Sequence, residues 1–159
     1  MLKKITRNHW WLCAVLLAGV FAANTTTAQS TVALSDDKPF AEVHVIIQAS
    51  QADHGRHTLV LDIANNLTKH YGGQDMVDIE VIAFGPGVAM LIAAGNKHAD
   101  RIESLMEHGV HFYVCGNTLD TMTRQNGYRP SLISGVKTVQ TGVAFMLEEI
   151  SRGYTHIHP

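Results

Sequence analysis

Apolar and polar positions along the chain form short β-branched runs that alternate with segments of helical periodicity. The strand-like runs are residues 42–48, 77–84, 110–115, 136–140 and 154–158. Apolar residues recur at helical spacing in the segments between them, which end at about Tyr71, His108, Gln125 and Gly153. This alternation predicts one α/β domain with a parallel sheet covered on both faces. Right-handed crossovers are expected to place its helices on alternating sides.

The first 28 residues have the pattern of an export signal rather than of a folded element. A basic start is followed by an apolar stretch over residues 10–23 and by small residues up to Ala28, after which cleavage is expected. An uncleaved N-terminal anchor is the alternative interpretation. Residues 29–39 are predicted to be a flexible lead-in, and residues 40–159 a single domain. The expected location is the periplasm or the cell exterior.

The charge that remains after residue 28 argues against two classes of partner. All 14 acidic residues lie there with 9 basic ones, which gives a formal charge of −5. Nucleic acid is not an expected partner of such a surface, and no polybasic patch for anionic lipid is present. We therefore expect no stable membrane insertion once the signal is removed.

Cys115 is the residue most suggestive of chemistry. It is the only cysteine after residue 28, so no internal disulfide can form. It ends the run at 110–115 and precedes a predicted helix, where the positive helix end would favour a thiolate. An inert core cysteine is the alternative. Asn117 and Thr118 are expected to cap this helix and to stabilise a thiolate or persulfide through their amides.

Two further groups near the carboxyl ends of predicted strands are weaker candidates. His54 and His57 are expected in the loop after the first strand, where they would assist proton transfer or bind a metal; solvated loop histidines are the alternative, and no third ligand is evident. Gly85 and Gly87 surround Pro86 in a turn whose amides could hold an anion, although a plain tight turn is the favoured interpretation of this weak motif. No metal or cofactor is predicted.

Four parts of the sequence carry a family resemblance. The runs VIAFGPGV at 81–88 and FYVCGNTL at 112–119, with the segment from Arg101 to Val110 and the ending from Val143 to Pro159, resemble the DsrE/DsrF-like family. The resemblance implies a three-layer α/β/α fold with a five-stranded sheet and assembly into homo-oligomers. Some members relay sulfur as a cysteine persulfide, and their sulfur-carrying cysteine matches Cys115. Those relays work in the reducing cytoplasm, whereas this chain has the pattern of an exported protein.

Two functions from different classes follow from these observations. In the first, Cys115 accepts sulfane sulfur as a persulfide and passes it to a partner protein or a small thiol. In the second, the chain is a non-catalytic, oligomeric protein of the periplasm that binds a small ligand or a metal.

Overall fold

The computed structural model describes residues 38–159. The expected signal segment, 1–28, and all but the last two residues of the expected lead-in lie outside the described residues. None of the helices in the described part of the chain is long and apolar enough to cross a membrane.

Strands and helices alternate in the predicted order. The elements are β1 (Val43–Ala49), α1 (His54–His70), β2 (Val77–Ala83), the 3₁₀ helix η1 (Gly85–Leu91), α2 (Ala99–Glu107), β3 (Val110–Cys115), α3 (Gly116–Asn126), β4 (Lys137–Val139), α4 (Gly142–Ser151) and β5 (Thr155–Ile157).

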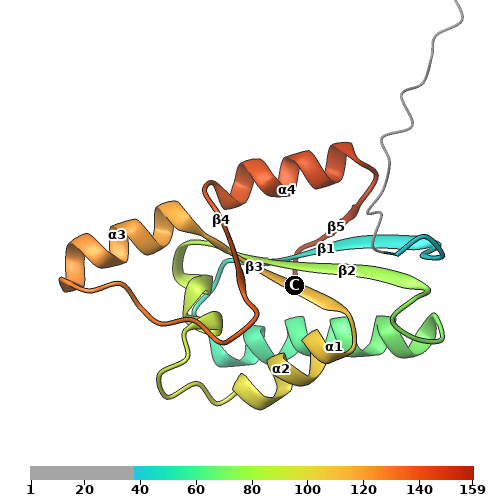
Figure 1. Ribbon diagram of the computed structural model, residues 1–159, viewed down its shortest axis with the longest axis horizontal. Coiled ribbons are helices and arrows are strands. Elements are labelled where there is room, and N and C mark those ends of the chain that lie inside the picture. Colours follow the sequence, from blue (N-terminus) through green and yellow to red (C-terminus); the bar gives the residue numbers. More distant parts are fainter. Residues whose placement is uncertain (1–37) are drawn as a thin grey trace, which may run out of the picture. The chain divides into compact units, whose positions relative to one another are not determined.

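The five strands form one parallel sheet in the order β4-β3-β2-β1-β5 (Figure 1). This confirms the predicted α/β class and the three-layer arrangement. Strand ends differ from the prediction by at most one residue. The amide of Phe84 still donates to the carbonyl of Ala49 at 3.1 Å, but Phe84 is already the residue that precedes η1.

The helices do not alternate between the two faces, so that expectation was wrong. Helices α1 and α2 cover one face of the sheet and α4 covers the other, while α3 extends beyond the carboxyl ends of the strands (Figure 1). The order of the strands explains this. From β1 to β4 the chain moves across the sheet in one direction, and right-handed crossovers in one direction keep their helices on one side. Only the return from β4 to β5 reverses the direction, so α4 lies on the opposite face.

The face under α1 and α2 holds the main apolar core. Alternate residues of the central strands point into it, and both helices supply aliphatic side chains. Its buried members include Ile47, Leu61, Val81, Ile102 and Phe112, each at most 1% exposed. Burial of this many large side chains is the main stabilising term of the fold, at about 1.5–3 kcal/mol for each.

The 3₁₀ helix η1 lies directly over the end of β1 because residue 87 is a glycine. A Cβ atom on Gly87 would lie 2.0 Å from the carbonyl oxygen of Ala49. That oxygen is backbone and cannot move aside without breaking its bond from Phe84. Gly87 is therefore required for close approach of two backbone segments.

The face under α4 is unusually acidic. Asp78 and Glu80 on β2 are buried there with Glu149 of α4. Tyr154 donates its hydroxyl hydrogen to Asp78, and Arg152 donates to both carboxylate oxygens of Glu149 at 2.8 and 3.0 Å. Burial, with repulsion from Glu149 and Asp78, raises the pKa of Glu80 to about 8. Glu80 is therefore mostly protonated at neutral pH.

This acidic layer makes stability depend on pH in a defined direction. Between pH 4.5 and 8 the folded state keeps a proton on Glu80 that the unfolded chain has released. The contribution of Glu80 to the free energy of unfolding therefore falls as pH rises through this range, by up to about 1.4 kcal/mol per pH unit. Glu80→Gln should remove that slope and make the protein more stable than wild type at pH 8, as measured by urea unfolding at several pH values. Exposed Glu148→Gln is the control; if both variants follow the wild-type pH dependence, Glu80 is not the group responsible.

Candidate functional site

The N-termini of two helices, α3 and α4, lie beside the sulfur atom of Cys115. Cys115 ends β3 and is itself the N-cap residue of α3, with extended backbone dihedral angles (φ −71°, ψ 115°). Helix α4 begins at Gly142, whose backbone amide donates to Cys115 Sγ at 3.3 Å. The positive dipole ends of both helices therefore lie beside one sulfur, and the first amide of α4 donates to it.

This approach depends on a glycine that sequence reasoning missed. A Cβ atom on Gly142 would lie 3.0 Å from the Cβ of Cys115 and 3.3 Å from that of Phe84. Any larger residue would push the start of α4 away from the thiol. The pair Thr141-Gly142 at the start of a predicted helix was visible in the sequence, but its contact with a residue 27 positions earlier was not.

The surroundings of the thiol favour its charged form. Burial raises the pKa of Cys115, but hydrogen bonding from the Gly142 amide, from the hydroxyl and amide of Thr118 and from the amide of Asn117 outweighs it. The net result is a lowered pKa. Thr118 Oγ1 also accepts a hydrogen bond from the Gly85 amide at 3.1 Å, which fixes its position beside the sulfur.

The thiol is largely buried, with Cys115 only 6% exposed. In its protonated form the thiol can donate to the carbonyl oxygen of Gln140, which lies 3.8 Å from Cys115 Sγ. Two surface pockets are lined by residues that surround the sulfur, one by Gln140 and Thr141 and the other by Gly85 and Thr118, but Cys115 itself lines neither of them. Access to the sulfur therefore depends on the small exposed part of Cys115 itself.

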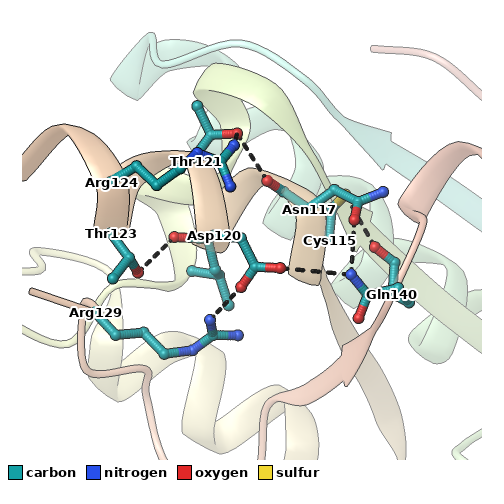
Figure 2. Close-up of polar contacts among 9 residues, drawn as sticks. Cys115, Asn117, Asp120, Thr121, Thr123, Arg124, Arg129 and Gln140 are labelled. Atoms are coloured by element: carbon teal, nitrogen blue, oxygen red, sulfur yellow. Dashed lines mark hydrogen bonds and ion pairs between the residues drawn. The ribbon is translucent and has the colours of Figure 1, made fainter.

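A polar network ties α3 to the segment that precedes α4 (Figure 2). The side chain of Gln140 donates to Asn117 Oδ1 at 2.6 Å, and the backbone amide of Asn117 donates to the backbone carbonyl of Gln140 at 3.0 Å. The Gln140 side chain also donates to the carboxylate of Asp120 at 3.5 Å, and Asp120 forms an ion pair with Arg129 at 2.6 Å. These bonds hold the two helix starts together around the sulfur.

The predicted capping role of Asn117 and Thr118 was wrong. Helix α3 begins at Gly116, so Asn117 and Thr118 lie inside its first turn and Cys115 occupies the cap position without a side-chain cap bond. Asn117 instead links α3 to Gln140 and to Thr141, and Thr118 links α3 to Gly85.

Gly85 and Gly87 use their amides within the protein. The Gly85 amide donates to Thr118, and the Gly87 amide donates to the Phe84 carbonyl at 3.1 Å. Gly85 adopts φ +54°, a left-handed value that glycine tolerates. This arrangement is that of a tight turn, and it leaves neither amide free for an anion.

His54 and His57 lie in the first turn of α1 rather than in a loop. Helix α1 begins earlier than expected because Asp53 caps it, accepting the Arg56 amide at 3.0 Å. Helix α1 covers the face of the sheet opposite α4 (Figure 1), whereas the Cys115 sulfur contacts the start of α4, so the two histidines and the thiol belong to different faces. The two imidazoles face His98 instead, with ring centroids 5.9 and 6.1 Å from it.

The comparisons with known proteins agree with this architecture. The protein of unknown function MTH1491 from Methanobacterium thermoautotrophicum has a similar structure, with a TM-score of 0.65 and 28% identity over 74% of this chain and 100% of that one. The ychN protein from E. coli shares the fold, with a TM-score of 0.55 and 20% identity over 74% of this chain and 99% of its own. No curated protein matches the sequence.

The family model described as the DsrE/DsrF-like family matches residues 41–159, which is nearly all of the predicted domain. This confirms the resemblance noted in the sequence. The chain belongs to the DsrE/DsrF-like family.

Proposed function

We propose that this protein carries sulfane sulfur as a persulfide on Cys115. The observation that carries the proposal is the meeting of two helix N-termini at one sulfur, with the Gly142 amide 3.3 Å from it. A thiolate is the nucleophilic form of cysteine, and positive helix ends favour it at neutral pH. The same donors would stabilise the negative charge of a persulfide.

The transfer step is an exchange between sulfur atoms. The Cys115 thiolate attacks the outer sulfur of a persulfide or polysulfide donor, and the donor's S–S bond breaks as a new S–S bond forms on Cys115. The donor leaves as a thiolate, so charge is conserved and no external oxidant is needed. In the second step an acceptor thiolate attacks the outer sulfur of the Cys115 persulfide, and the Cys115 thiolate leaves.

The burial of Cys115 favours a small donor. Because Cys115 is only 6% exposed, a polysulfide ion or a low-molecular-weight persulfide would reach the thiol more readily than a folded protein would. The added sulfur would extend past Gln140, whose carbonyl now faces the thiol hydrogen.

We also propose that the protein acts outside the cytoplasm and as a homo-oligomer. The export pattern of residues 1–28 supports the location. Val143, Leu147 and Ile150 support assembly: they are 43%, 58% and 36% exposed and share one side of α4 at helical spacing. An interface there would adjoin the site, because the first residue of α4, Gly142, donates its amide to Cys115 Sγ.

Polysulfide treatment of the untagged protein, followed by intact mass measurement, tests the sulfur-carrying step. The protein should gain the mass of one sulfur atom, and a reducing agent should remove it. Cys115→Ser should gain none. No gain on the wild-type protein, or an equal gain on Cys115→Ser, would refute the proposal.

Thr118→Val tests whether the local donors activate the thiol. The substitution keeps the shape of Thr118 but removes its hydroxyl, so the rate of Cys115 alkylation at mildly acidic pH should fall roughly tenfold, as expected for loss of one charge-assisted hydrogen bond. Thr121→Val is the matched control, since Thr121 bonds to the Asn117 carbonyl on the same helix. Equal rates in the two variants would show that Thr118 has no role at the sulfur.

Leu147→Glu tests assembly through α4. Light scattering after gel filtration should show the wild-type protein as an oligomer and Leu147→Glu as a smaller species. Phe40→Glu is the control, because Phe40 is 71% exposed but lies away from this helix in the sequence. A monomeric wild-type protein would contradict the proposed assembly. It would not bear on the chemistry of Cys115, which the mass measurement tests separately.

A further inference from the structure

Three histidine side chains converge on the face of the sheet opposite α4. His54 and His57 come from the first turn of α1, and His98 immediately precedes α2. One ring nitrogen from each lies within 4.8 Å of the others. The three ring centroids are 5.9 to 6.1 Å apart.

The tautomer of His57 leaves a nitrogen for a metal. Its Nε2 lies 2.7 Å from the carbonyl oxygen of Gln51, which can only accept a hydrogen bond. Nε2 therefore carries the hydrogen, and Nδ1 keeps its lone pair. A histidine ligand that donates its other N–H to a carbonyl is the usual arrangement in metal sites. His57 is also 3% exposed, so its ring is held by packing.

His98 contributes a ring nitrogen, Nε2, that forms no hydrogen bond within the described part of the chain. This atom is also buried. A buried nitrogen of this kind is costly unless something binds it. The loop around it is nevertheless ordered: the Asn96 side chain donates to the carbonyls of Met90 and Ile92 at 2.7 and 2.8 Å and accepts the His98 amide at 2.8 Å.

The elements that present the three rings are fixed to each other. Asp53 caps α1 immediately before His54. Arg101 of α2 pairs with Asp62 of α1 at 2.5 Å, which links the two helices. The spacing of His54 and His57 places both rings on one side of α1.

We propose that His54, His57 and His98 form a three-histidine site for a divalent transition-metal ion, with Zn²⁺ as the expected occupant. Three neutral imidazoles suit zinc, copper and nickel, and no carboxylate is among the ligands that would favour magnesium or calcium. Three protein ligands leave a fourth position for water or a small ligand.

The geometry requires only a small movement to close around an ion. Zinc–nitrogen bonds of about 2.0–2.1 Å bring tetrahedral ligand atoms to roughly 3.3 Å from one another, compared with a present limit of 4.8 Å. His54 is exposed and free to rotate toward the two more fixed rings. The site is independent of Cys115, which lies on the α4 side of the sheet.

The test is a zinc titration of untagged protein that has been stripped with a chelator. Calorimetry should show one Zn²⁺ bound per chain, and Tm should rise by roughly 5–10 °C when zinc is 100-fold above its Kd. Cobalt in place of zinc should give the visible absorption bands of a four-coordinate ion. His54→Ala, at an exposed position, should lower zinc affinity at least tenfold without loss of fold. His98→Gln, which keeps a polar side chain, should do the same.

Two variants serve as controls. The double variant His70→Ala/His158→Ala removes two histidines outside the cluster, and Cys115→Ser removes the thiol; both should bind zinc as the wild-type protein does. Absence of micromolar binding by the folded wild-type protein would overturn the proposal. So would unchanged affinity in His54→Ala, or an equal loss in the double histidine control. Loss of binding in Cys115→Ser would assign zinc to the thiol instead and likewise overturn it.

Discussion

The convergence of two helix N-termini on the Cys115 sulfur is the interaction on which the proposed chemistry depends. Burial alone would keep the thiol protonated and inert. The amide of Gly142 and the start of α3 reverse that balance, and they do so only because residue 142 has no side chain. The hydrogen bonds among Gln140, Asn117 and Asp120 hold the two helices in this position.

The two faces of the sheet have different chemical character. The face under α4 carries buried carboxylates beside the start of β3 and the thiol at the other end of that strand, whereas the face under α1 and α2 combines the main apolar core with a histidine cluster at its rim. Both candidate sites follow from the parallel arrangement, because each strand delivers its carboxyl end to the same edge. The direction of the crossovers then separates the sites onto opposite faces.

Much of this architecture was predictable from the sequence, because β-branched runs and helical periodicity report directly on burial. The location of Cys115 at a strand end also followed from its neighbours. Two features that the sequence did not reveal are contacts between distant residues. Periodicity cannot show that Gly142 touches Cys115, or that His98 completes a cluster begun by His54 and His57. The capping error arose because Cys115, which is not a typical cap residue, occupies the cap position that Asn117 or Thr118 was expected to fill.

The most direct test of the account is the ionisation of the thiol itself. The ultraviolet absorbance of the thiolate, titrated against pH and corrected by subtracting the Cys115→Ser variant, gives the pKa of this one group. The account predicts a midpoint clearly below the value of about 8.5 for a free cysteine. A midpoint at or above that value would contradict it, because burial would then outweigh the helix amides.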